Sequence, residues 1–520
     1  MKTCIKIFFF PLCFVIFSIL QSSAQSCYPD GLFLLSQADV DAFGEDHPDC
    51  KVIEGTLFIG GVGITNLDGL SGIEEVKLGI SISSSEVLEN TSGLSSLKKV
   101  GGKVLVSDNP ILVSIEELTN LDSIGTSVII VRNESLQKIS GFSGAHTLRS
   151  IDINNNPELD TLIAFQNVQS ITHLDILNNY KLKYANILNS MDSCISIRVA
   201  NSPDLVRFEG FENLEYTDNL HLSDMQDIPE FNNLISLGVM QLHRCQAKEI
   251  RGFSKLETVL TTLGFTLCDS LEVLDGFNSL VQVGRLYIEL NRNQRSLKGF
   301  QNLESVRTFE VGGLPLLEEL EAFNELELVD SVLKFIISNP AITDLNFLSN
   351  IKKAKEIYIG QSSLFGESYL TDISALDDLD HEYLRELRIV GCPELEICSH
   401  YGVCRFLERE DAIHDIRDNA PGCNSAEEIL ENCVVSSVEE GAEVSKITIS
   451  PNPVRQIFKI HTDDDLKINS WLIFSIDGIQ ILKGESSDME INLTQFPEGI
   501  YLVHVTTDKG VFIEKLILSN

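Results

Sequence analysis

Hydrophobic residues between Glu54 and Leu395 recur about every 23 residues, a period that is typical of stacked repeats. In one coil they are Leu159, Leu162, Phe165, Val168, Ile171, Leu174 and Ile176. Their spacing of three is typical of tight turns or 3₁₀ segments, and the final step of two is typical of a short strand with one buried face. Each coil is therefore predicted to contain one strand and three turning sides.

One inward-facing strand position, defined by Ile153, can be followed through about 15 coils. Its equivalents are Ile59, Ile82, Val106, Ile130, Ile176, Val199, Leu222, Leu242, Phe265, Ile288, Val311, Ile336, Ile359 and Ile389. A single coil cannot bury its own apolar edge, so coils must stack, and each buried Leu or Ile then contributes about 1.5 to 3 kcal/mol. The sequence predicts a mainly β protein with a parallel β-solenoid over residues 54–395.

Asparagine recurs three residues after this strand position. The residues are Asn109, Asn133, Asn156, Asn179, Asn291 and Asn339. A buried carboxamide at a turn can satisfy backbone groups of its own and a neighbouring coil, so these residues are predicted to form a structural ladder. Met225 and Leu314 take the same position in two coils, which we expect to be locally irregular. A column of phenylalanines from Phe142 to Phe347, at one-coil spacing, predicts an aromatic spine.

The N-terminus has the pattern of a secretory signal peptide over residues 1–24. Lys2 and Lys6 precede an apolar run that ends before Ser22-Ser23-Ala24. Cys27 leaves lipidation open as an alternative, although Ala24-Gln25-Ser26 is a poor lipobox. No later stretch has the apolar length to span a bilayer. The formal net charge of −37 argues against nucleic acid and anionic lipid as partners.

The repeat frame divides the cysteines into two groups. Cys245, Cys268 and Cys392 occupy the asparagine position and Cys194 an apolar strand position, so these four are predicted to be buried thiols. Six more bracket the array and are candidates for disulfides: Cys27, Cys50, Cys398, Cys404, Cys423 and Cys433.

Disulfides in these positions would cap the exposed ends of a solenoid. Cys27 and Cys50 form the natural pair of an N-terminal cap over residues 25–53. The last four lie in a predicted C-terminal cap over residues 396–433 and can pair in three ways. A zinc site is the alternative for these four, but the spacing and the predicted export argue against it. No metal and no cofactor is predicted.

The pattern changes after the cysteines. Residues 434–445 are polar and have no repeat frame, which indicates a linker. Residues 446–520 contain about seven short alternating segments separated by turns with Pro, Asp and Gly. This pattern predicts a small antiparallel Ig-like β-sandwich, for which a role in adhesion is one interpretation.

Several motifs in this tail occur in a fixed order: Pro451, Asn452, Pro453, Asp477, Gly478, Gly499, Tyr501 and Lys515. With these motifs the tail resembles the type A C-terminal sorting domain of the type IX secretion system of Bacteroidetes-group bacteria. The resemblance implies a partner, the type IX machinery, and a location outside the cell or on its surface. It says nothing about the activity of the exported protein.

Asn-Pro and Gly-Phe pairs, such as Asn156-Pro157 and Gly141-Phe142, recur in the array. In this respect it resembles leucine-rich repeats, and more closely receptor L-domains. The segment from Cys398 to Cys433 resembles the cysteine cap that often follows such arrays in secreted proteins.

The residues beside each strand anchor are predicted to point outward and to form two columns on one sheet face. Candidates for ligand binding in these columns are Asp152, Asp175, Arg198, His221, His243, Tyr287, Glu289 and Glu310. Toward the end of the array the same frame places Phe335 and Tyr358 outward and Lys334 inward. A long polar sheet face is typical of a recognition platform for an extended protein or glycan.

We therefore predict a non-catalytic binding or adhesion protein on the cell surface or in the medium. A structural spacer and a solvated face without a ligand are the alternatives. An enzyme, such as a surface hydrolase, would use His221 and His243 near Asp175 as metal ligands or as an acid–base pair. The chain has no Gly-x-Ser-x-Gly, His-Glu-x-x-His or phosphate-binding glycine motif, so no catalytic residue is predicted.

Overall fold

The structure, a computed structural model, describes residues 25–336, 339–361, 368–433, 447–462, 467–475, 480–484, 490–507 and 510–519. It divides into two units between Cys433 and Val434, each with its own hydrophobic core. The predicted signal peptide at 1–24 and the predicted linker at 434–445 lie outside the described residues.

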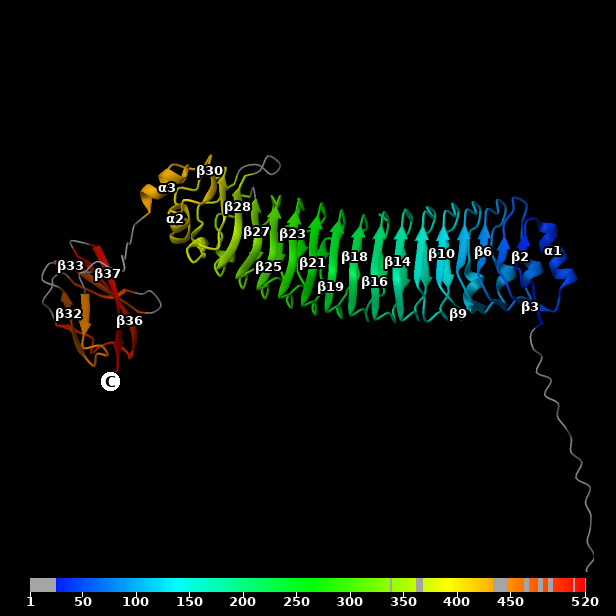
Figure 1. Cartoon of the computed structure of the whole chain (residues 1–520), viewed down its shortest axis with the longest axis horizontal. Coiled ribbons are helices and arrows are strands. Elements are labelled where there is room, and N and C mark those ends of the chain that lie inside the picture. The colour runs from blue at the N-terminus through cyan, green and yellow to red at the C-terminus, as the bar shows by residue number, and fades with distance from the viewer. Residues whose placement is uncertain are drawn as a thin grey trace, which may run out of the picture. The chain divides into compact units, whose positions relative to one another are not determined.

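The first unit is a β-solenoid whose main sheet is parallel throughout, so the predicted fold class is confirmed (Figure 1). In the described part of the chain this sheet has 17 strands. They are β2 (Leu32–Leu34), β4 (Leu57–Ile59), β6 (Ile80–Ser83), β8 (Val104–Ser107), β10 (Ser127–Val131), β12 (Ser150–Asn154), β14 (Ser170–Leu177), β16 (Ser193–Ala200), β18 (Tyr216–Ser223), β19 (Ser236–His243), β21 (Thr258–Thr266), β23 (Gln282–Glu289), β25 (Ser305–Gly312), β27 (Leu328–Ile336), β28 (Lys353–Gly360), β29 (Glu386–Val390) and β30 (Ile413–Arg417).

Among the described residues of the solenoid, the turning sides of the coils form three short parallel sheets and five 3₁₀ segments. The sheets comprise β1 (Gln25–Cys27), β3 (Cys50–Ile53), β5 (Glu75–Val76), β7 (Lys99–Val100) and β9 (Ser123–Ile124); β11 (Lys138–Gly141), β13 (Thr161–Ala164), β15 (Tyr184–Ile187) and β17 (Arg207–Glu209); and β20 (Glu249–Ile250), β22 (Val273–Leu274), β24 (Ser296–Lys298) and β26 (Glu319–Glu321). The 3₁₀ segments are η1 (Asp68–Leu70), η2 (Ser92–Leu94), η3 (Glu116–Asn120), η4 (Asn346–Leu348) and η5 (Ser374–Leu376).

Helices lie at both ends of the solenoid (Figure 1), and disulfides stabilise both caps. Helix α1 (Gln37–Asp46) lies at the first end, and α2 (Tyr401–Leu407) and α3 (Ala426–Asn432) lie at the other. The disulfides are Cys27–Cys50, Cys398–Cys423 and Cys404–Cys433. Two of these bonds therefore select one of the three pairings that the sequence left open.

The main sheet extends one strand beyond the predicted array at each end. Leu34 pairs with Ile59, and Ile416 pairs with Ile389. The two added coils belong to the segments that the sequence analysis assigned to caps. Their strands are short and their intervals differ from 23 residues, so the repeat pattern does not single them out.

Each ladder asparagine binds the turn of the coil that precedes it. Asn156 Nδ2 donates to the carbonyl of Ile130 at 2.9 Å, and Asn156 Oδ1 accepts from the Asn133 backbone N–H at 3.1 Å. Equivalent contacts are made by Asn109, Asn133, Asn179, Asn291 and, in the C-terminal cap, Asn419. The carboxamides thus satisfy backbone groups that the strands leave unpaired.

Thiols replace the carboxamide in two adjacent coils. The Sγ atoms of Cys245 and Cys268 lie 3.5 and 3.8 Å from the carbonyls of Leu222 and Leu242, the same positions that asparagine binds elsewhere. Both thiols are buried and free, as are Cys194 and Cys392. Burial raises the pKa of Cys194 to about 12 and that of Cys392 to about 11, so these thiols stay protonated at neutral pH.

The phenylalanine column forms stacked rings inside the solenoid. Phe277 lies between Phe253 and Phe300, with ring centroids 4.9 and 5.1 Å away. Phe142 and Phe165 stack in the same way, at 5.0 Å. The rings are fully buried, so the spine adds specific packing to the burial of the aliphatic residues.

The predicted register was wrong in β27. Phe335, not Ile336, pairs with Val311 and Ile359 and points into the core, where it is 1% exposed. The register of β27 shifts against both β25 and β28, and these shifts accommodate one additional residue in β27. Lys334 therefore faces outward, and the predicted outward aromatic at Phe335 is absent. Asn339 is displaced with it and donates to Leu314 and Leu317 rather than to Val311.

The coils at Met225 and Leu314 keep the left-handed residue of their neighbours before the ladder position. The Met225 coil is nevertheless irregular, as expected, because it has no short strand between β17 and β20 and so interrupts the turning-side sheet. The residue before the ladder position is left-handed in most coils, and Asp224 and Gly313 adopt this conformation with φ of 52° and 65°. Met225 and Leu314 themselves are fully buried. An apolar side chain fills the ladder position without changing the left-handed residue before it.

The described residues of the second unit form two antiparallel sheets, in agreement with the predicted sandwich. One contains β31 (Ile447–Ser450), β32 (Ile457–Thr462) and β35 (Ile491–Asn492), and the other contains β34 (Gln480–Gly484), β33 (Ile468–Ser475), β36 (Gly499–Thr507) and β37 (Gly510–Leu518). Its core includes Trp471, Ile473 and Val503.

We expect Asn156→Ala to destabilise the solenoid by about 2 to 4 kcal/mol, because it leaves the buried Ile130 carbonyl and Asn133 N–H without partners. Asn167→Ala is the control, since Asn167 is exposed and makes one hydrogen bond, to the Ser143 carbonyl. Urea unfolding followed by circular dichroism measures both variants. Equal midpoints for the two would contradict the ladder.

Candidate functional site

The outward residues of the main sheet form the columns that the sequence predicted. The central column pairs Asp152, Asp175, Arg198, His221, Gln241, Gly264, Tyr287 and Glu310 on consecutive strands from β12 to β25. The flanking column places His243 beside Ser223 and Thr266, and Glu289 beside Thr266 and Gly312. All eight candidate residues thus lie on one sheet face, which we call the binding face.

The first cluster on the binding face is a bidentate ion pair next to an unsatisfied carboxyl group. Arg198 Nε and Nη2 donate to Asp175 Oδ1 and Oδ2 at 2.7 and 2.6 Å. On the neighbouring strand, Asp152 Oδ1 is shielded from solvent and has no hydrogen-bond partner among the described residues. Burial and the nearby charge of Asp175 raise the pKa of Asp152, and Arg198 offsets this only partly.

The two histidines do not converge on Asp175. His221 is half-buried, and burial lowers its pKa even though its side chain hydrogen-bonds Gln241. His243 Nδ1 lies 2.9 Å from Thr266 Oγ1, and Asp175 is held by Arg198. Each member of the acid–base set considered as the enzymatic alternative therefore has a different partner.

The second cluster is built around Tyr287. Its ring lies over Gly264, where an added Cβ would be 2.0 Å from Tyr287 Cζ. The Arg285 guanidinium is 5.0 Å from the ring centroid and pairs with Glu310. Burial raises the pKa of Tyr287, whose hydroxyl also interacts with Gln241. Gly264 thus makes room for an aromatic ring, and Arg285 packs against that ring.

Sequence reasoning missed two residues of this cluster. Arg285 lies in a third outward column, which exists because β23 extends further toward its N-terminus than the predicted strand. Lys334 was placed inward by the register error, yet its Nζ is 3.5 Å from Glu289 Oε1. Sequence analysis could have found Arg285, because it lies two residues before Tyr287 and side chains two apart in a strand point to the same face.

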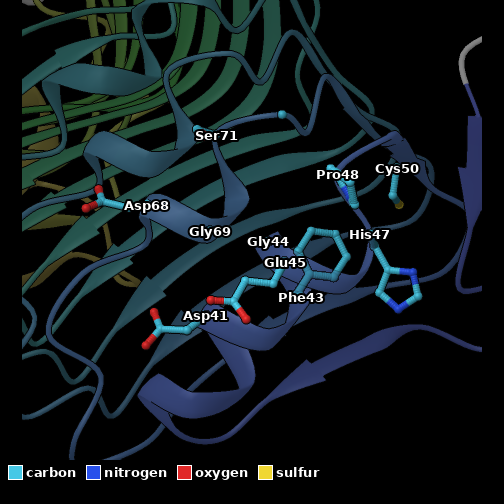
Figure 2. Close-up of a pocket in the computed structure, with 11 residues that line it drawn as sticks. Asp41, Phe43, Gly44, Glu45, His47, Pro48, Cys50, Asp68, Gly69 and Ser71 are labelled. Atoms are coloured by element: carbon cyan, nitrogen blue, oxygen red, sulfur yellow. The ribbon is translucent and has the colours of Figure 1, made fainter.

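Away from the binding face, a cavity of about 480 Å³ lies at the N-terminal cap between α1 and η1 (Figure 2). In this view His47 lies on the far side of Phe43 from the carboxylates of Asp41 and Asp68. His47 packs instead against Tyr28, with ring centroids 5.3 Å apart. Within the described residues, no group of three or more His, Cys, Asp or Glu side chains is placed to hold a metal ion.

The sorting motif is brought together by the second unit. Asn452 Nδ2 donates to the Lys515 carbonyl, and Asn452 Oδ1 accepts from the Ile517 N–H at 2.9 Å. Tyr501 donates to the carbonyl of Pro497 at 2.6 Å, and Gly499 begins β36. Pro451 and Pro453 flank Asn452, whereas Asp477 and Gly478 lie outside the described residues.

Comparison with known proteins identifies the second unit. Residues 448–519 match the family model described as a secretion system C-terminal sorting domain. The resemblance to the type IX sorting domain is thereby confirmed, and the domain indicates export to the cell surface or the medium. No helix among the described residues is long and apolar enough to cross a membrane.

Similarity to solved structures is weak. A leucine-rich repeat protein from Bacteroides ovatus, known from a crystal structure, is 15% identical, with a TM-score of 0.20. The match covers 71% of this chain and 87% of that chain. A search of curated proteins gave no match.

Asp152→Asn should stabilise the unliganded protein at neutral pH, because it removes a carboxylate that is desolvated and faces Asp175. A raised pKa in the folded state means that the native protein binds more protons than the unfolded chain between the two pKa values. The contribution of Asp152 to the free energy of unfolding is therefore fully present below its pKa in the unfolded chain and is lost as pH rises through its pKa in the folded protein. The stability gained in Asp152→Asn should shrink toward zero as the pH is lowered.

Urea midpoints of wild type and variant, measured across that pH range, test this expectation. Asp160→Asn is a useful control, since hydrogen bonds to Lys183 and Thr161 lower the pKa of Asp160 and its variant should lose stability at neutral pH. A difference in urea midpoint between wild type and Asp152→Asn that does not change with pH would contradict the raised pKa of Asp152.

Proposed function

We propose that this exported protein is a non-catalytic binding or adhesion protein, whose binding face recognises an extended glycan or protein. The export itself follows from the sorting domain. The ligand and the site are the proposed part, and they rest on the chemistry of the two clusters around Arg198 and Tyr287.

One observation carries the proposal: the shielded Asp152 Oδ1 has no partner although it lies on an open sheet face beside a fixed ion pair. An unsatisfied acceptor costs about 1 to 3 kcal/mol, and a ligand that supplies the missing donor is one explanation for such a group in a native structure. A hydroxyl or amide N–H from a ligand would satisfy it once rotation of the Asp152 side chain brings the oxygen to the open face.

The Tyr287 cluster supports the same interpretation. Its ring is fixed by Gly264 and Arg285, so little side-chain entropy remains to be lost on binding. A rigid tyrosine flanked by Arg285 and Glu310 suits a sugar, which presents an apolar ring face and hydroxyl groups. This favours a glycan over a protein as the ligand.

Binding is favoured over catalysis because the titratable groups are already engaged by separate partners. A general acid–base pair requires two groups within reach of one substrate position. His221, His243 and Asp175 instead contact Gln241, Thr266 and Arg198.

Tyr287→Ala and Arg198→Ala should each weaken ligand binding about tenfold or more without lowering thermal stability much, because both side chains are anchored on the surface. The assay is a glycan and protein array probed with the purified full chain, followed by titration of the strongest binder. Gly264→Ala should have a similar effect, since its methyl group displaces the Tyr287 ring.

Lys181→Ala is the matched control, because it removes an exposed ion pair, to Glu158, from outside the binding face. If Tyr287→Ala, Arg198→Ala and Gly264→Ala all retained wild-type ligand affinity, the binding face would not be the ligand site. A strong protein binder with no glycan binder would keep the face as the site but correct the ligand class.

A further inference from the structure

A groove of about 740 Å³ runs along the turns that follow the main-sheet strands in the first coils. It crosses consecutive coils from β6 to β14, whose strands are parallel and in register. The binding face lies on the strands themselves, so this groove is a separate surface. Its volume is in the range of ligand-binding clefts.

One row of the groove combines carboxylates and apolar rings. From coil to coil it contains Glu86, Pro110, Glu134, Pro157 and Tyr180. Tyr180 is 51% exposed, and Val62 adds a further exposed apolar side chain, 66% exposed, at the first end. Glu86 and Glu134 are therefore two coils apart, and the next coil after each of them presents a proline ring.

The two carboxylates of this row are available to a ligand. Glu86 and Glu134 are exposed, and neither has an ion-pair or hydrogen-bond partner for its side chain within the described residues. Arg132, the nearest cation in the groove, donates both Nε and Nη2 to Asp108 at 2.6 and 2.8 Å. That pair neutralises itself and leaves two uncompensated negative charges.

We propose that this groove binds an extended basic peptide in the polyproline II conformation, with Lys or Arg at every third position. Neighbouring parallel strands are about 4.8 Å apart, so Glu86 and Glu134, two coils apart, are separated by about 9.6 Å. Polyproline II rises about 3.1 Å per residue with three residues per turn, so residues i and i+3 point the same way about 9.3 Å apart.

A peptide in the β conformation cannot place side chains on one face at the spacing of Glu86 and Glu134. Its residues i and i+3 point to opposite faces, and its i and i+2 side chains are only about 6.7 Å apart. The rings of Pro110, Pro157 and Tyr180 offer the kind of apolar contact that polyproline II ligands use. The net charge of −37 adds a long-range attraction for a basic partner.

The test uses fluorescein-labelled peptides and the purified full chain in anisotropy titrations at low salt. The peptide (Lys-Pro-Pro)₃ should bind more tightly than an alternating Lys-Pro peptide with the same number of lysines, because only the first matches the carboxylate spacing. It should also bind more tightly than (Lys-Gly-Gly)₃, which lacks the preformed conformation. Binding should weaken as salt is added.

Glu86→Gln and Glu134→Gln should each lower the affinity for (Lys-Pro-Pro)₃ about threefold, and the double variant about tenfold. Glu257→Gln removes the same charge from an exposed position outside the groove and should change nothing. Melting temperatures should stay unchanged, since both groove carboxylates are exposed.

Equal affinity for the two lysine spacings, or no loss in the double variant, would overturn the proposal. So would displacement of the labelled peptide by neutral oligosaccharides, which would make the groove a glycan site. Arg198→Ala and Tyr287→Ala should retain peptide binding, so failure here is distinguishable from failure of the proposed binding face.

Discussion

The structure depends on the contact between one coil and the next. A coil has an apolar interior edge and a turn with unpaired backbone groups, and neither can be satisfied within the coil. The neighbouring coil supplies the buried aliphatic and phenylalanine side chains, the strand hydrogen bonds and the carboxamide of the ladder asparagine. Because Asn156 binds both Ile130 and Asn133, it fixes the position of the earlier turn as well as its own. Solenoid stability is therefore a sum of nearest-neighbour terms, and the two ends need caps.

The same constraint determines what the surface can do. Stacking in register places one outward residue per strand column on every coil, so the surface presents side chains at regular intervals of about 4.8 Å. On the binding face these residues form fixed clusters, because Arg198 reaches Asp175 on the adjacent strand and Tyr287 covers Gly264. At the turns that follow the strands they give a row of carboxylates and rings. Both surfaces suit extended ligands that repeat along their length.

The second unit is built on a different principle and serves a different purpose. Its antiparallel sheets close around a core of their own, and Asn452 ties the first turn of the unit to its last strand. This arrangement explains how motif residues that are far apart in the sequence, such as Asn452 and Lys515, become neighbours. The sorting domain carries the address of the protein, while the solenoid carries its proposed ligand-binding surfaces.

Much of the fold could be predicted because repetition makes local patterns add up. A single Leu-x-Ile is ambiguous, but its recurrence every 23 residues identifies Ile153 and its equivalents as core positions. The same frame separated the buried thiol of Cys245 from the disulfide cysteines, and it placed Asp152, Arg198 and Tyr287 on one face. Prediction failed where the repeat length changed: an extra residue near β27 turned Phe335 inward and Lys334 outward, and the short strands β2 and β30 escaped notice.

The sequence by itself determined the periodicity, and with it the architecture, the inward and outward positions and the export tail, because these depend on the type and spacing of residues. Only the tertiary structure decided which neighbours meet across coils. The pairing of Cys398 with Cys423, the bidentate contact of Arg198, the unsatisfied Asp152 and the groove beside Pro110 all depend on lateral contacts between residues about one coil apart. Such contacts are set by side-chain rotamers and turn geometry, which a one-dimensional pattern does not contain.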